Sequence, residues 1–271
     1  MQPRIFAEPA PSADFRLSYG EDSNHVIDFR ASTVPGLRPL AIMIHGGFWR
    51  ERFSLLYAGH TCAALASAGF ATANIEYRRT GHPGAGWPGT FQDVVRAVQF
   101  ARAHAAQVSG DPARALVIGH SAGGHLALWL AAEIPDLAGV VSLGGVASLR
   151  LGCEMEIGSG AVREFLGTTP AASPELYRAA DPEGRPSAVA RVLIHGTADD
   201  RVPVELSREY VRLRQADPGP VKLVELPAAD HFDVVDPQSR FFPAVIDELN
   251  RLPTSSPALP DSRPAAAPPG E

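Results

Sequence analysis

Residues 119–131 read "GHSAGGHLALWLA", a stretch that sets one serine among glycines and continues at once into apolar residues. The preceding "ARALVI" is typical of a β-strand, and Leu126, Trp129, Leu130 and Ile134 follow at the spacing of a buried helix face. Ser, Gly and Ala alone would also suit an ordinary tight turn. A strand, a sharp turn and a helix in this order instead favour a nucleophile elbow, with Ser121 at the carboxyl end of the strand.

The composition is that of a globular protein. The chain has 271 residues, 45% of them hydrophobic and 20% charged, which suits one large α/β domain or two small ones. The formal net charge of -6 argues against nucleic acid as a partner, because phosphate binding needs a clustered basic face. Cys62 and Cys153 are too few and too far apart for a disulfide framework or a zinc motif, so we expect no metal and no other cofactor.

The two ends of the chain carry no targeting signal that we recognise. Residues 1–15 lack the apolar core of a signal peptide, and no stretch approaches the ~20 apolar residues of a membrane-spanning helix. We therefore expect a cytoplasmic protein without a membrane partner, and the oligomeric state is left open. Residues 253–271 are rich in Pro, Ala and Ser, which predicts a disordered tail after a folded domain over residues 1–252.

Apolar runs alternate with helical patterns along the domain. The runs lie at residues 40–45, 71–77, 114–119, 137–144, 191–196 and 221–226. Their all-apolar character predicts a mostly parallel sheet with helices on both faces, and residues 15–30 predict an antiparallel hairpin at its edge. Residues 145–187 break the alternation with Gly, Pro and Ser, and are interpreted as a short lid-like insertion over the site or, alternatively, a surface excursion.

A serine nucleophile needs a base to take its proton and a carboxylate to orient that base. After an elbow these follow in the order Ser, Asp or Glu, His. His125 comes too soon after the elbow, and His195 precedes the best acid candidates. His231, in a loop after the last predicted strand, is therefore the predicted base.

The predicted acid lies in "HGTADDRVP", residues 195–203, directly after a strand. Asp199 and Asp200 both stand at the mouth of this strand, and we favour Asp199. Either one could instead cap the helix that begins near Pro203. Asp230 is adjacent to His231 and is poorly placed to reach its neighbour's ring, so it is interpreted as a loop-capping residue.

The predicted oxyanion hole lies in "IMIHGGFW", residues 42–49. Glycines after an early strand let the backbone approach a substrate closely. The N–H groups of Gly47 and Phe48, together with that of Ala122, are predicted to converge on the oxygen of a tetrahedral intermediate.

Four motifs together carry a family resemblance: "HGGFW", "GHSAGGHLA", "HGTADDRVP" and "DHF". They resemble the HGG-type esterases of the α/β-hydrolase fold, and the Trp after HGG-aromatic resembles the arylformamidase (kynurenine formamidase) branch. The match runs from about Phe15 to about Leu252. The resemblance implies Ser121, Asp199 and His231 as the catalytic triad and the three N–H groups above as oxyanion donors.

Aromatic residues gather at the predicted strand ends. Trp49, Trp87 and Phe232 are candidate substrate-binding residues for a flat, partly apolar group, although each could equally be core packing. The leading hypothesis is a serine hydrolase that cleaves a small carboxylic ester or an aryl formamide through an acyl-enzyme. The alternatives are a peptidase like prolyl oligopeptidase and a non-catalytic small-molecule-binding protein on the same fold.

Overall fold

The structure is a computed structural model and describes residues 4–252. The predicted Pro/Ala-rich tail, residues 253–271, lies outside the described residues. The boundary between domain and tail therefore stays a prediction.

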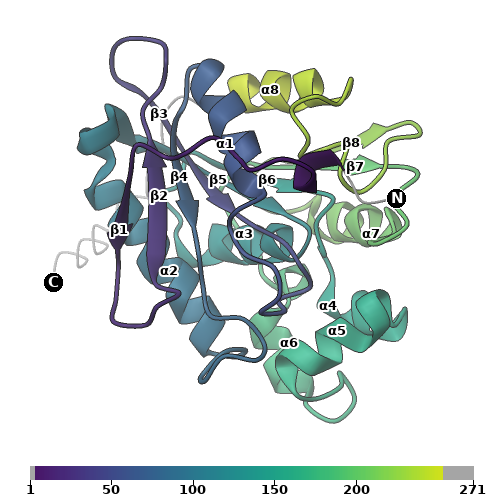
Figure 1. Cartoon of the computed structure of the whole chain (residues 1–271). Coiled ribbons are helices and arrows are strands. Elements are labelled where there is room, and N and C mark those ends of the chain that lie inside the picture. Colours follow the sequence, from purple (N-terminus) through teal and green to yellow (C-terminus); the bar gives the residue numbers. More distant parts are fainter. Residues whose placement is uncertain (1–3, 253–271) are drawn as a thin grey trace, which may run out of the picture.

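One sheet of eight strands crosses the molecule in the order β1-β2-β4-β3-β5-β6-β7-β8 (Figure 1). The strands are β1 (Phe15–Ser18), β2 (Val26–Arg30), β3 (Arg38–Ile44), β4 (Ala71–Ile75), β5 (Gly110–His120), β6 (Gly139–Leu143), β7 (Arg191–Gly196) and β8 (Val221–Leu226). β2 pairs antiparallel with both β1 and β4, and every other neighbouring pair is parallel. The predicted parallel sheet with an antiparallel edge hairpin is confirmed.

Helices cover both faces of the sheet (Figure 1). The main ones are α1 (Ala58–Ser67), α2 (Gly89–Ala103), α3 (Ala122–Glu133), α7 (Glu205–Arg214) and α8 (Phe242–Arg251). Leu65 of α1 and Leu249 of α8 belong to one apolar cluster. Val98 of α2, Leu126 of α3 and Tyr210 of α7 belong to a second cluster. The two clusters are the two layers of a helix–sheet–helix core, as all-apolar parallel strands require.

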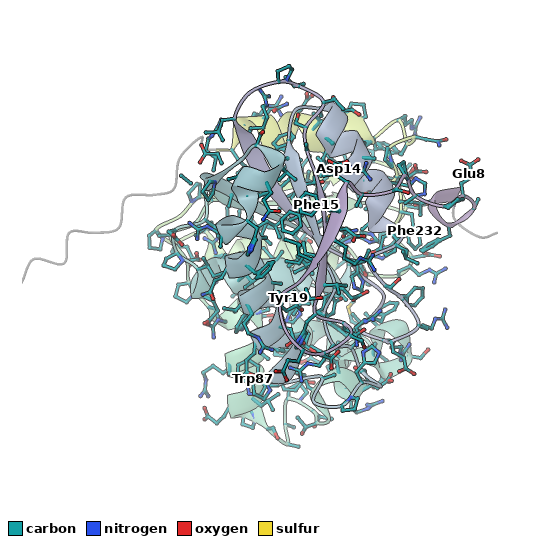
Figure 2. The ribbon with its side chains drawn as sticks, turned by 60° about the vertical axis from the view of Figure 1, so that its left-hand side comes forward. Glu8, Asp14, Phe15, Tyr19, Trp87 and Phe232 are labelled. Carbon is teal, nitrogen blue, oxygen red and sulfur yellow. The ribbon has the colours of Figure 1, made fainter. Side chains whose placement is uncertain are left out.

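The burial of individual elements follows their place in the sheet. Every residue of β4, β6 and β7 is buried, whereas β1 alternates between half-buried and exposed residues because it forms the edge, where Figure 2 labels Phe15. The helix after Ser121 differs from the expected single apolar stripe, because all residues from Ala122 to Ala131 are buried. Central strands and neighbouring helices surround α3 on all sides, so its amphipathic pattern is weak.

The expected insertion, residues 145–187, folds into three short α-helices and the 3₁₀-helix η3 (Pro182–Gly184). The α-helices are α4 (Leu149–Glu154), α5 (Ile157–Leu166) and α6 (Pro174–Ala180). Phe165 stacks on Trp49 with ring centroids 4.7 Å apart, and a Cβ on Gly158 would lie 2.6 Å from the Phe48 ring. The insertion therefore packs against the loop that follows β3.

Candidate active site

Ser121 lies on a sharp turn between β5 and α3. Its φ of 56° and ψ of -118° form a conformation that costs a non-glycine residue about 1–3 kcal/mol. The turn fits only because its neighbours lack side chains: a Cβ on Gly119 would lie 2.0 Å from Gly123 O, and one on Gly123 would lie 2.1 Å from Ile44 O. The two glycines thus hold Ser121 at the strand end, directly before the helix N-terminus.

His231 and Asp199 come together from the loops after β8 and β7. His231 Nδ1 donates to Asp199 Oδ2 at 2.7 Å, and both side chains are buried. His231 also lines a small pocket together with Ser121. Asp200, the alternative acid, points outward with its side chain 80% exposed and pairs with Arg201 at 3.3 Å. The structure therefore brings Asp199, and not Asp200, to the predicted base.

Hydrogen bonds fix the charge of Asp199. Its Oδ1 accepts the backbone N–H groups of Arg201 at 2.9 Å and Val202 at 2.8 Å. Burial by itself would raise the pKa of Asp199, but hydrogen bonds with His195 and His231 outweigh it and hold that pKa well below the usual range. The carboxylate is consequently ionised at neutral pH and holds the proton of His231 on Nδ1.

Two of the three predicted oxyanion donors, Gly47 and Phe48, lie in the loop after β3, and Ala122 is the first residue of α3. Gly47, Phe48 and Trp49 have φ values of 112°, 53° and 55°, so the chain turns tightly beside Ser121. A Cβ on Gly46 would lie 2.7 Å from Ser121 Cβ, which shows how close the loop and the elbow are. Within residues 4–252, no protein acceptor is recorded for the N–H groups of Gly47, Phe48 and Ala122. These groups are available to a ligand.

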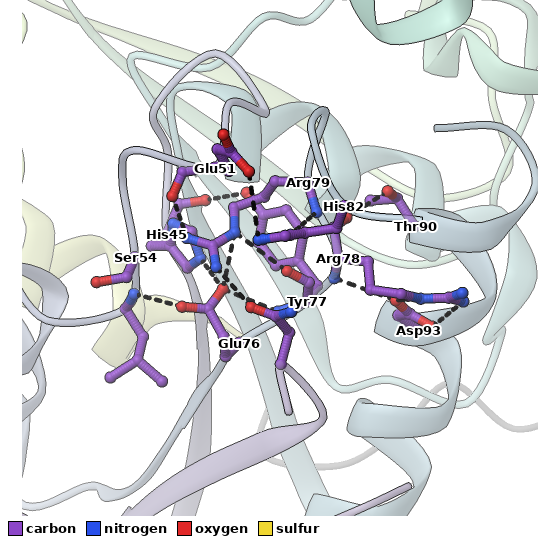
Figure 3. A network of polar contacts seen from close by, with 12 residues as sticks. His45, Glu51, Ser54, Glu76, Tyr77, Arg78, Arg79, His82, Thr90 and Asp93 are labelled. Atoms are coloured by element: carbon purple, nitrogen blue, oxygen red, sulfur yellow. Dashed lines mark hydrogen bonds and ion pairs between the residues drawn. The ribbon is translucent and has the colours of Figure 1, made fainter. Parts of the chain in front are cut away.

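A buried network of hydrogen bonds around His45, Glu76 and Tyr77 holds the start of this loop in place (Figure 3). His45 Nε2 lies 2.7 Å from Glu76 Oε1, and Glu76 Oε2 accepts the Leu55 N–H at 3.0 Å. The Tyr77 hydroxyl donates to His45 O at 2.9 Å. Glu76 was not predicted from the sequence, where its only signal is an acid directly after the strand β4.

A second chain of hydrogen bonds, also missed from sequence, connects three site loops. The Gly46 N–H donates to the Tyr57 hydroxyl at 2.6 Å, and that hydroxyl lies 2.8 Å from His120 Nδ1. His120 Nε2 lies 3.0 Å from His231 O. Burial lowers the pKa of His120 to about 3, so its ring is neutral and can accept at Nδ1 while it donates from Nε2.

The pocket beside Ser121 is small and lined by aromatic rings. Its volume is about 50 Å³. The lining residues are Phe6, Gly47, Phe48, Phe53, Tyr57, His120, Ser121, Arg201, His231 and Phe232. Of the aromatic residues singled out from sequence, the pocket contains Phe48 and Phe232.

Trp49 and Trp87 lie elsewhere. Trp49, in the loop after β3, is fully buried, and its ring stacks on Phe165. Trp87 lines a separate groove with Phe91 and Trp129, and Figure 2 shows it well apart from Phe232. The structure therefore does not bring these two tryptophans to the Ser121 pocket.

The described part of the chain lacks two other kinds of functional feature. Residues 4–252 hold no group of three or more His, Cys, Asp or Glu side chains arranged to bind a metal ion. None of the helices in this range combines the length and apolar character needed to cross a bilayer. Both cysteines are free and buried.

Comparison with known proteins finds esterases by sequence. Residues 30–136 match the BD-FAE family model. Esterase LipC of Mycobacterium tuberculosis is 31% identical over 245 residues, covering 82% of this chain and 60% of the relative. The probable carboxylic ester hydrolase LipM of the same organism is 31% identical over 257 residues, covering 86% and 58%. The chain thus spans about three fifths of the length of these curated relatives.

Solved structures agree on the architecture. A truncated carbohydrate esterase from gut microbiota aligns with a TM-score of 0.75 at 19% identity, covering 90% of this chain and 98% of that one. A thermophilic esterase from Thermogutta terrifontis aligns with a TM-score of 0.70 at 21% identity, covering 92% and 94%. With the mostly parallel sheet and the elbow at the end of β5, these matches show that the chain has the α/β-hydrolase fold.

Proposed function

We propose that this chain hydrolyses small carboxylic esters through an acyl-enzyme intermediate. The observation that carries the proposal is the 2.7 Å contact between His231 and Asp199 beside a pocket that Ser121 also lines. An ionised carboxylate, an imidazole and a serine on a strained elbow are the parts that nucleophilic acyl transfer requires. The sequence relatives named above, which are esterases, support an ester as the substrate.

In the proposed reaction, each of these groups has one role. Ser121 Oγ attacks the carbonyl carbon while His231 Nε2 takes the hydroxyl proton, and the carbonyl oxygen becomes an oxyanion. His231 then gives that proton to the departing alcohol as the carbon–oxygen bond breaks. A water molecule repeats both steps on the acyl-enzyme, which releases the acid and restores the serine.

Backbone N–H groups stabilise the charge that develops on the oxygen. Gly47 and Phe48 present N–H groups from the β3 loop, and Ala122 presents one at the start of α3. Preorganised donors of this kind contribute most when the site excludes water, and each is worth about 3 kcal/mol in the transition state. The aromatic lining of the pocket provides such an environment.

The pocket volume favours a short acyl group. About 50 Å³ has room for only a few water molecules, since a cavity of about 10–15 Å³ holds one. Acetyl and formyl groups are the acyl groups of this size. Aryl formamide hydrolysis, as in arylformamidases, is therefore the second candidate substrate class.

The test compares kcat/KM for 4-nitrophenyl acetate, N-formylkynurenine and a proline-linked 4-nitroanilide. We expect ester turnover in the wild type and its loss by a factor of at least ~10⁴ in Ser121→Ala, with an unchanged melting temperature. Ser67→Ala, on the exposed side of α1, is the matched control and should retain full activity. Efficient formamide turnover without ester turnover would favour the second candidate, and activity retained in Ser121→Ala would exclude the proposed mechanism.

A further inference from the structure

The N-terminal segment over residues 4–14, which we name the strap, reaches from the edge of the sheet to the Ser121 pocket. It can be followed in Figure 2 from Asp14 to Glu8. Asp14 Oδ2 accepts the Ala31 N–H at 2.8 Å at one end, and Glu8 O accepts from His60 Nε2 at 3.0 Å near the other. Ile5 is buried in the core cluster that contains α1 and α8. The strap is thus held at both ends.

Phe6 is the residue that the strap contributes to the pocket. Its ring centroid lies 5.2 Å from that of Tyr57 and 5.3 Å from that of Phe232. The other lining residues come from four loops between residues 47 and 232, which carry the oxyanion donors, Ser121 and His231. Phe6 therefore closes one wall of a pocket whose other walls hold the catalytic groups.

We propose that Phe6 limits the length of the acyl group that the enzyme accepts. This inference rests on the proposed esterase function. The acyl group is the part of the substrate that stays bonded to Ser121 after the alcohol leaves, so it must fit in the space beside that serine. In a pocket of about 50 Å³, the Phe6 ring occupies space that a longer acyl chain would need.

Several of the other lining residues also hold the catalytic groups in place. Tyr57 and His120 belong to the hydrogen-bond chain that reaches Gly46 and His231. Phe48 belongs to the loop after β3, which carries two of the proposed oxyanion donors. Phe6 forms none of these hydrogen bonds, so the length limit can change while the catalytic groups stay in place.

The strap also has room to adapt to a smaller side chain at its end. Residues 7–9 are exposed, and residues 9–13 border a cavity of about 420 Å³ between the strap, β1, β2 and α1. A second cavity of about 280 Å³ lies beside Ile5 and Glu8. Since the strap covers these spaces and contributes little to the central core, removal of the Phe6 ring should leave the domain folded.

The test measures kcat/KM for 4-nitrophenyl esters from acetate to octanoate in the wild type and in Phe6→Ala. We expect the hexanoate-to-acetate ratio to rise at least ~10-fold, since each methylene that a pocket admits or excludes changes kcat/KM by about 10-fold or more. The readout is this ratio, because a loss of activity that affects all esters alike leaves it unchanged. Phe15→Ala is the matched control, because it removes the same ring near the other end of the strap, where Phe15 stacks on Phe29.

The possible results separate the role of Phe6 from the proposed esterase function. An unchanged ratio in a Phe6→Ala protein that still turns over acetate would overturn the inference and leave the esterase function intact. A shift seen only when the alcohol is lengthened, from methyl to butyl acetate, would also overturn it by placing Phe6 on the leaving-group side. If Phe6→Ala melts early, Phe6→Leu should show a smaller shift in the same direction. A wild type inactive on every ester would overturn the proposed function itself.

Discussion

Substitution of Asp199 by Asn tests the proposed triad most directly, because the surroundings of Asp199 dictate how an amide would sit there. Oδ1 accepts two backbone N–H groups, from Arg201 and Val202. An amide must keep its carbonyl oxygen at that position, so its NH₂ group must face His231. His231 could then only accept at Nδ1, and its proton would move to Nε2.

The magnitude follows from the tautomer. With its proton on Nε2, His231 cannot accept the proton of Ser121, and the wrong tautomer in a Ser-His-Asp triad costs about 10⁴-fold in kcat. This corresponds to about 5 kcal/mol of activation free energy. The folded state should lose less, about 1 kcal/mol, because His195 Nε2 lies 3.2 Å from Asp199 Oδ2 but keeps Val202 O at 2.8 Å as an acceptor.

The assay is kcat at saturating 4-nitrophenyl acetate, combined with urea unfolding of the same preparations. Asp200→Asn is the matched control and should behave as the wild type, because the Asp200 carboxylate is exposed. A kcat for Asp199→Asn near the wild-type value would refute the argument. So would a crippled Asp200→Asn protein with an active Asp199→Asn counterpart.

Two further predictions concern the oxyanion loop and a buried histidine. Gly46→Ala should lower kcat by about 100-fold, because its Cβ would lie 2.7 Å from His120 O and would push the loop from the serine; undiminished kcat would contradict this. Burial lowers the pKa of His125 from 6.5 to about 4, so the unfolded chain binds more protons between these values and stability falls as the pH drops below 6.5. When the pH is lowered from about 7.5 to about 5.5, the unfolding free energy of the wild type should fall by about 1.4 kcal/mol more than that of His125→Gln. Urea titrations at both pH values measure these losses, and equal losses would show that His125 is not responsible.

Much of the fold follows from local sequence patterns. The run over residues 191–196 predicts β7, and every residue of this strand is buried. The run over 221–226 predicts β8, but the expected all-apolar character is wrong there, because β8 forms the other edge of the sheet and carries Lys222 and Glu225 among half-buried residues. The helices of the insertion were harder to predict. α5 begins at Ile157 and continues with Gly158, Ser159 and Gly160, all at positive φ, so no regular apolar spacing marks its start.

The site could be predicted as far as chain order reaches. The order of the motifs along the sequence favours His231 among the histidines, and the position after a strand favours Asp199 and Asp200. The choice between these two aspartates depends on the direction of two adjacent side chains in one loop. The same limit applies to Phe48 and Trp49. Their consecutive positive φ values place Phe48 at the pocket and Trp49 in the core, which neither composition nor spacing encodes.

The Gly46–Tyr57–His120–His231 chain explains how such distant loops keep a common geometry. It joins the oxyanion loop, the residue before Ser121 and the backbone of the base through contacts of 2.6, 2.8 and 3.0 Å. This series of hydrogen bonds requires a neutral His120 ring, because Nδ1 must accept while Nε2 donates. A pKa of about 3 for His120 meets that requirement at neutral pH. Burial of His120 therefore preserves the hydrogen bonds that connect the loop after β3, the residue before Ser121 and the His231 backbone.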